Sequence, residues 1–209
     1  MIDTWLSKTK LKDAYERFVK KIFLGRISAN QLTIIGLIFG IFSAFIIYLS
    51  KKVAFTLEFN IIACILMVLS FMLDTMDGPI ARAGEPSQFG GILDLFSDRT
   101  VEIFIIIAVV STDPISLVWP GLFSLGAMVL CISMFLIVST LSEETEEINE
   151  IKKLIRYRKG FMERAETLLC FFFIVLLFPW RFILLWLFAA LVFLTAVLRL
   201  KDGYKLFNI

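Results

Sequence analysis

The chain alternates long apolar runs with short segments that carry its charged residues. A helix that crosses roughly 30 Å of hydrocarbon needs about 20 mostly apolar residues. Six runs approach or reach that length, at residues 32–50, 60–77, 91–110, 118–141, 167–179 and 182–198. The run at 167–179 reaches it only if its helix begins near Glu163. The pattern therefore predicts an all-α membrane protein with six transmembrane helices.

Two further segments have helical patterns but do not qualify as spans. Residues 2–24 mix apolar and basic positions at helical spacing, which is typical of an amphipathic helix in the membrane interface. A cytoplasmic packing helix is the alternative interpretation of this segment. Residues 142–164 run from acidic to basic, which suits an exposed helix with ion pairs across its turns. We therefore divide the chain into an amphipathic juxtamembrane segment at 1–26 and a six-helix domain at 27–209.

The basic residues indicate the orientation of the predicted spans. Of the 21 Lys and Arg residues, 17 fall on the side of the two termini, and only Lys51, Lys52 and Arg181 fall on the other side. Cytoplasmic loops of membrane proteins carry an excess of Lys and Arg. We therefore expect both termini and the charged loops to be cytoplasmic.

Composition supports membrane insertion and excludes several function classes. Of the 209 residues, 59% are hydrophobic, against about 45–50% in soluble proteins. A net charge of +2 argues against electrostatic binding of nucleic acid. Histidine is absent, so catalysis must depend on carboxylates, Arg, Lys, Tyr, Ser or Thr. The three Cys residues lie inside apolar runs without metal-type spacing, and we interpret them as core or lipid-facing thiols.

Four Asp residues border the second and third apolar runs. Asp74 and Asp77 are three positions apart, and Asp94 and Asp98 are four apart, so each pair lies on one helical face. The short turn between the two runs predicts antiparallel neighbouring helices and convergent carboxylates. An ionised Asp at mid-bilayer costs about 2.5–3.5 kcal/mol even by the lower estimates, so four together indicate a functional site.

The Asp cluster predicts a metal site with a phosphate-bearing substrate. One or two divalent cations would compensate its charge, and ligands without His or Cys suit Mg²⁺, Mn²⁺ or Ca²⁺. Bound Mg²⁺ normally shares its coordination with substrate phosphate oxygens. Arg82 is placed to reach such a phosphate, and Gly78 and Gly90 allow close approach of a ligand. Gly78 and Pro79 should also break or bend the second span, while Arg99 is either a partner of the Asp cluster or a substrate contact.

These residues resemble the signature of the CDP-alcohol phosphatidyltransferase family, D-x-x-D-G-x-x-A-R followed by G-x-x-x-D-x-x-x-D. Its eight fixed positions are Asp74, Asp77, Gly78, Ala81, Arg82, Gly90, Asp94 and Asp98, within 25 residues. The segment 27–33 also resembles the approach to the first span in that family, with Ala29 in place of the usual Pro. The amphipathic segment and the six predicted spans are similar to the family as well.

The resemblance implies a reaction in which the hydroxyl of an acceptor alcohol attacks the β-phosphorus of a CDP-alcohol and releases CMP. It implies two divalent cations, Mg²⁺ or Mn²⁺, with Asp98 as the general base. The metal ligands would be Asp74, Asp77, Asp94 and Asp98. The residues that bind the cytidine diphosphate would be Asp74, Asp77, Gly78, Ala81, Arg82 and Gly90. It also implies CDP-diacylglycerol as the favoured donor, contact with membrane lipid, and a homodimer.

We expect residues outside the motif to determine which acceptor alcohol binds. Basic side chains expected at the same cytoplasmic face are candidates for binding an acceptor phosphate, although orientation alone would also place them there. They are Arg156, Arg158, Lys159, Arg164 and Arg199. We favour a polyol phosphate acceptor, such as inositol phosphate or glycerol phosphate. The alternatives are a CDP-linked head group with a lipid or polyol acceptor and, from another class, a cation-coupled membrane transporter.

Overall fold

A computed structural model of the chain describes residues 15, 17, 19, 21–23, 25–51, 56–84, 87–144 and 164–207. Within these residues all regular structure is helical, as the hydrophobic pattern predicts. The elements are α3 (Ala29–Ser50), α4 (Thr56–Ala83), α5 (Gln88–Thr112), α6 (Pro114–Glu144), α8 (Arg164–Leu176), the 3₁₀-helix η1 (Phe178–Trp180) and α9 (Arg181–Phe207).

Four of these segments are long and apolar enough to cross a membrane, judged by length and composition. They are Ala29–Ser50, Thr56–Ala83, Pro114–Thr140 and Phe178–Lys205. The other two predicted spans differ from them for separate reasons. α5 has 25 residues but contains Asp94, Asp98, Arg99 and Glu102, and the described part of α8 has only 13 residues. The all-helical membrane architecture is therefore confirmed, with four candidate spans.

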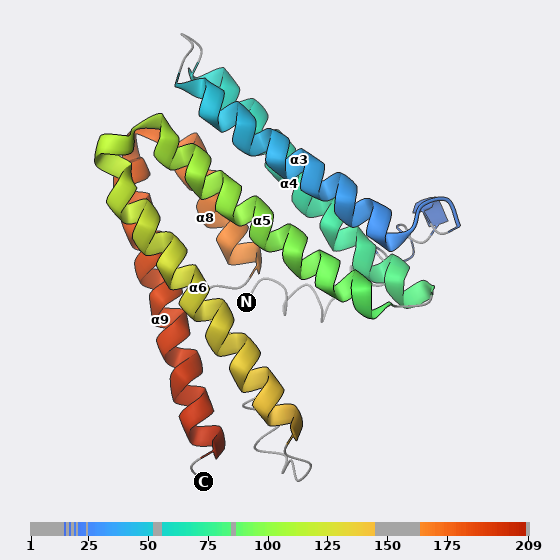
Figure 1. The fold of residues 1–209 in the computed structure, drawn as a ribbon. Coiled ribbons are helices and arrows are strands. Elements are labelled where there is room, and N and C mark those ends of the chain that lie inside the picture. The colour runs from blue at the N-terminus through green and yellow to red at the C-terminus, as the bar shows by residue number, and fades with distance from the viewer. Residues whose placement is uncertain are drawn as a thin grey trace.

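Helix α3 packs beside α4 and α5 in one half of the bundle (Figure 1). It packs extensively against both α4 and α5, whereas α4 and α5 make few contacts with each other. The predicted pairing of α4 and α5 is thus made through side chains around Asp74 and Asp98 rather than through closely packed backbones. Glycines on α3 explain the difference, since a Cβ on Gly36 would press on the Ser70 carbonyl of α4, and one on Gly40 would overlap Val101 of α5. These two positions allow the neighbouring backbones to approach closely.

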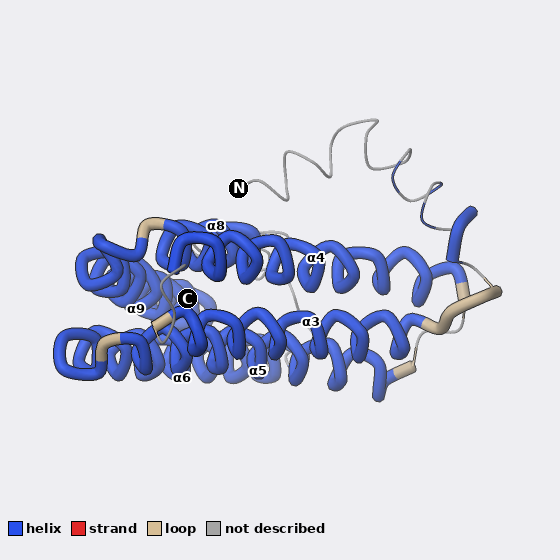
Figure 2. Tube along the Cα trace, turned by 90° about the horizontal axis from the view of Figure 1, so that it is seen from above, coloured by secondary structure: helices blue, strands red, loops and turns tan. Residues whose placement is uncertain are grey.

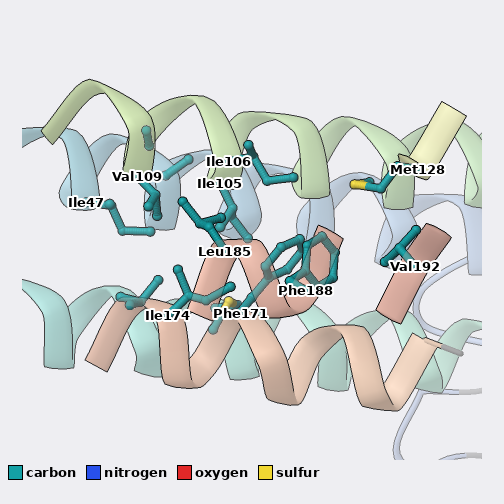
Figure 3. Close-up of a cluster of buried hydrophobic side chains, with 14 of the residues drawn as sticks. Ile47, Ile105, Ile106, Val109, Met128, Phe171, Ile174, Leu185, Phe188 and Val192 are labelled. Carbon is teal, nitrogen blue, oxygen red and sulfur yellow. The ribbon is translucent and has the colours of Figure 1, made fainter. Parts of the chain in front are cut away.

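The second half of the bundle is built by α6 and α9, which pack along each other, while α8 lies against α4 (Figure 2). A shared apolar core joins the two halves (Figure 3). Its labelled members come from α3, α5, α6, α8 and α9, and they include Ile47, Ile105, Phe171 and Phe188. This core fixes the start of α8 beside α4 and α5, which positions the first residue of α8 for the site described below.

A buried arginine holds the helices together at the end of the bundle opposite the Asp cluster. Arg181 is 6% exposed and donates hydrogen bonds to Thr112 Oγ1 at 2.9 Å and to Asn60 Oδ1 at 3.1 Å. It also donates to the backbone carbonyls of Ile174 and Val175. Because a buried guanidinium needs its donors satisfied, these bonds link the start of α9 to α4, α5 and α8.

Helix α4 runs through Pro79 and ends at Ala83, so the break expected at Gly78 and Pro79 does not occur. Proline removes one backbone hydrogen bond and crowds the preceding turn. The next residue compensates for this loss through packing, because Ile80 is buried in a small core with Val19 and Leu32. Tertiary contacts thus hold the last turn of α4 in helical form.

The described part of the N-terminal segment contacts the bundle. Tyr15 and Phe23 pack against the small core around Val19, and the Tyr15 hydroxyl lies 3.1 Å from Thr75 Oγ1. The rest of the amphipathic helix predicted over 2–24 lies outside the described residues, and its interfacial position stays a prediction. Most of the helix predicted over 142–164 also lies outside them.

Candidate active site

Three of the four motif carboxylates converge between α4 and α5. Asp74, Asp94 and Asp98 each offer a carboxylate oxygen, and these atoms all lie within 4.8 Å of one another. Asp74 is 7% exposed, and the other two are half-buried. Such a group of oxygen ligands in a partly buried site suits a hard divalent cation. The predicted convergence is therefore found for three carboxylates.

The fourth carboxylate, Asp77, is held by α3. Thr33 donates its hydroxyl hydrogen to Asp77 Oδ2 over 2.6 Å, and Thr33 itself is buried. Thr33 belongs to the segment 27–33, but the sequence analysis assigned it no contact with the cluster. The predicted role of Asp77 as a fourth metal ligand stays a prediction.

A guanidinium group lies among the three convergent carboxylates. Arg164, the first residue of α8, forms an ion pair with Asp74 and a 2.5 Å hydrogen bond from Nη2 to Asp98 Oδ1. The same nitrogen lies 3.7 Å from Asp94 Oδ1. The pocket thus accommodates a positive charge, and the donor set fits a divalent cation. The prediction of a divalent-cation cofactor is confirmed, without a choice between Mg²⁺ and Mn²⁺.

The predicted nucleotide-binding residues of α4 lie on its last turns, close to the cluster. Gly78 has open space around it, because a Cβ there would meet only the Arg82 side chain, at 3.3 Å from Nη1. Ala81 is half-buried and Arg82 is exposed. This end of α4 therefore leaves room for a ligand beside Asp77, and the binding roles of these residues stay predictions.

Gly90 has a structural role in addition to its predicted one. Its N–H donates to the Oγ of Ser87, which caps the start of α5, over 2.9 Å. A Cβ on Gly90 would lie 3.0 Å from Asn30 Oδ1 of α3. Glycine thus allows the first turn of α5 to approach α3, which places Asp94 and Asp98 opposite Asp74.

Two cavities adjoin the cluster. The smaller has a volume of about 50 Å³, and its charged lining residues are Asp74, Asp98, Glu102 and Arg164. The larger, of about 240 Å³, lies between α5, α6, α8 and α9, and its polar lining includes Arg99, Glu102, Arg164 and Arg199. Arg164 and Glu102 line both cavities, so the two spaces are neighbours.

The predicted acceptor residues that the structure describes, Arg164 and Arg199, both line the larger cavity. Arg199 is held there by a 2.8 Å hydrogen bond from Nη1 to the carbonyl of Cys131 and by the ring of Phe135, 4.9 Å from its guanidinium carbon. The other predicted acceptor residues, Arg156, Arg158 and Lys159, lie outside the described residues.

Arg99 and Glu102 form an ion pair that the sequence analysis missed. Arg99 Nη1 lies 2.6 Å from Glu102 Oε2, three residues further along α5. The ion-pair partner of Arg99 in the structure is Glu102. The predicted role of Arg99, as a partner of the Asp cluster or as a substrate contact, stays a prediction. The spacing was visible in the sequence, because Glu102 follows Asp98 by one turn and continues the face of Asp94 and Asp98.

The sequence profile of the CDP-alcohol phosphatidyltransferase family matches residues 26–197. The chain belongs to this family. It is 37% identical over 103 residues to an archaetidylinositol phosphate synthase of Pyrococcus horikoshii, an alignment that covers 49% of this chain and 50% of that protein. The chain thus spans half the length of that relative. It is also 25% identical over 197 residues to the inner membrane protein YnjF of Escherichia coli, covering 93% and 92% of the two chains.

The fold is similar to that of a solved phosphatidylinositol phosphate synthase. Phosphatidylinositol phosphate synthase (PgsA1) of Mycobacterium tuberculosis, with CDP-DAG bound, superimposes with a TM-score of 0.66 at 17% identity, over 94% of this chain and 95% of that chain. A second structure of PgsA1, in complex with manganese and citrate, also gives a TM-score of 0.66, at 18% identity over 92% and 88% of the chains.

Proposed function

We propose that the protein transfers a substituted phosphate group from a CDP-alcohol, with CDP-diacylglycerol favoured, to the hydroxyl of a polyol phosphate. The observation that carries this proposal is the pair of adjoining cavities that share Arg164. One contains the carboxylates of the family motif, and the other is lined by three arginines. An anionic acceptor near an acidic site needs such cationic side chains. Inositol phosphate and glycerol phosphate are the acceptors to be tested first.

In this proposal Asp98 is the general base. It takes the proton of the acceptor hydroxyl while the hydroxyl oxygen forms a bond to the β-phosphorus, and the bond between that phosphorus and the CMP oxygen breaks. A positioned base is required because an alcohol loses its proton far above pH 7. Divalent cations, held by Asp74, Asp77, Asp94 and Asp98, would neutralise charge on the diphosphate when bound.

The nucleotide is proposed to bind at the open end of α4. Arg82 would contact a phosphate, and Gly78, Ala81 and Gly90 would allow the cytidine diphosphate to approach Asp74 and Asp77. The support is the open space beside Gly78 and the motif spacing that the family shares. Arg164 and Arg199 would bind the phosphate of the acceptor.

We also infer a membrane placement with six spans. α5, with 25 residues, is long enough at 1.5 Å per residue to cross about 30 Å. α8 would reach that length if its helix began before Arg164. The Lys and Arg distribution supports a cytoplasmic active site and cytoplasmic termini. The N-terminal amphipathic helix, the homodimer and the boundary between 1–26 and 27–209 are part of this proposal.

Release of CMP in detergent tests the reaction class. Purified protein with Mg²⁺, CDP-diacylglycerol and inositol phosphate should form CMP only when donor and acceptor are both present. Glycerol phosphate, serine and CDP-linked head groups with diacylglycerol form the rest of the panel. No CMP with any pair would contradict the transferase, because a cation-coupled transporter produces no measurable change without a sealed vesicle.

Arg199→Ala is expected to raise the KM for the phosphorylated acceptor by about 10- to 150-fold. The variant removes charge-assisted hydrogen bonds worth roughly 1.5–3 kcal/mol. The KM for CDP-diacylglycerol should change little, because Arg199 lies in the larger cavity and is not part of the lining of the smaller one. Steady-state kinetics with each substrate varied in turn provides the measurement.

Lys201→Ala is the matched control, since Lys201 is exposed and lies two residues further along α9. It should leave both KM values unchanged. If Arg199→Ala and Arg164→Ala both behave like the parent, the hypothesis of a phosphorylated acceptor is wrong, and a neutral or lipid alcohol becomes the proposed acceptor.

A further inference from the structure

Glu102 lies on the boundary between the two cavities of the site. It is 9% exposed and follows Asp98 by four residues, so both side chains lie on the same face of α5. It lines the smaller cavity with Asp98 and the larger cavity with Arg164 and Arg199. A ligand that extends from Asp98 in the smaller cavity to Arg199 in the larger one therefore passes Glu102.

The carboxylate of Glu102 is buried but retains capacity to accept hydrogen bonds. Arg99 Nη1 lies 2.6 Å from its Oε2 atom and compensates its charge. Within the described residues, Oε2 accepts no hydrogen bond from any group other than this ion-pair partner. An ionised carboxylate offers about four lone-pair sites. Since buried polar groups are stabilised by hydrogen bonds, a ligand that carries donors would be favoured at this position.

We propose that Glu102 is a specificity-determining residue that accepts hydrogen bonds from hydroxyl groups in the middle of the acceptor. The inference rests on the proposed function, in which one acceptor hydroxyl lies at Asp98 and the acceptor phosphate lies at Arg164 and Arg199. A hydroxyl-rich ring phosphate, such as inositol phosphate, presents further hydroxyls between these two ends. Arg99 holds the Glu102 carboxylate and reduces its repulsion of the phosphate.

The test separates contacts to hydroxyls from contacts to phosphate. The first quantity is the KM for inositol phosphate, and the second is the inhibition constant of inorganic phosphate competing with it, which reports on the phosphate position alone. Glu102→Gln should raise the KM for inositol phosphate about tenfold, because a neutral amide oxygen replaces a charged carboxylate oxygen as the partner of the hydroxyl groups. The inhibition constant of inorganic phosphate should stay the same or fall, since a negative charge is removed. Arg199→Ala should raise both quantities.

Glu58→Gln is the matched control, because Glu58 is exposed at the far end of α4 and should change neither quantity. If Glu102→Gln does not fold, Glu102→Asp keeps the charge, withdraws the carboxylate by one methylene, and should also raise the KM for inositol phosphate.

Two results would overturn the role of Glu102 and leave the proposed function standing. One is a Glu102→Gln variant that folds and keeps the parent KM for inositol phosphate. The other is a parent enzyme that uses glycerol phosphate but not inositol phosphate. By contrast, if inorganic phosphate does not compete with any acceptor, the hypothesis of a phosphorylated acceptor is contradicted. The proposed role of Glu102, which depends on that hypothesis, is then contradicted as well.

Discussion

Asp98→Asn is expected to abolish turnover and to leave CDP-alcohol binding largely intact. Asn has nearly the same shape as Asp but cannot take the proton of the acceptor hydroxyl. General bases typically contribute 10²- to 10⁴-fold to a rate, so we expect a loss of at least about 10²-fold in kcat. Binding should persist because Asp74, Asp77 and Asp94 remain, and Arg164 keeps its ion pair with Asp74.

The measurement combines kcat from CMP release with calorimetric binding of CDP-diacylglycerol to the inactive variant. Asp113→Asn is the control, because Asp113 is exposed at the other end of α5 and takes no part in the proposed chemistry. If Asp98→Asn loses nucleotide binding as severely as Asp74→Asn does, Asp98 is chiefly a ligand and the base must be sought elsewhere.

Chelation with EDTA should remove activity completely, and Mg²⁺ or Mn²⁺ should restore it. The site has three convergent carboxylates and one guanidinium, so Arg164 alone leaves negative charge that would repel a diphosphate. A divalent cation would remove this repulsion when bound, and the carboxylates would release the cation to EDTA, which binds it more strongly. CMP release before EDTA, after EDTA and after addition of each metal gives the measurement.

Circular dichroism of the chelated protein serves as the control, since the helices pack through apolar side chains and should remain folded. An enzyme that keeps full activity after exhaustive chelation would contradict the metal site and most of the proposed mechanism.

Features that depend on local spacing could be predicted from the residues alone. Apolar runs predicted the six helices, because a helix needs only its own residues to satisfy its backbone in a membrane. The start of α3 is equally local, since Ser28 and Gln31 form a reciprocal capping box. The pairing of Asp94 with Asp98 on one face follows from helical periodicity. The family signature could be recognised for the same reason, since its eight positions lie within 25 residues at fixed spacing.

Which helices meet and which charges pair depends instead on tertiary packing. Gly36 and Gly40 let α3 pack closely against both α4 and α5, although only α4 and α5 are joined by the short turn that carries the motif. Arg164 reaches Asp74 because the apolar core places the start of α8 beside α4, a contact across 90 positions of the chain. Helical periodicity determines the face on which a side chain lies but not the helix that this face contacts. That choice depends on the shapes of packed surfaces, which residues distant in the sequence create together.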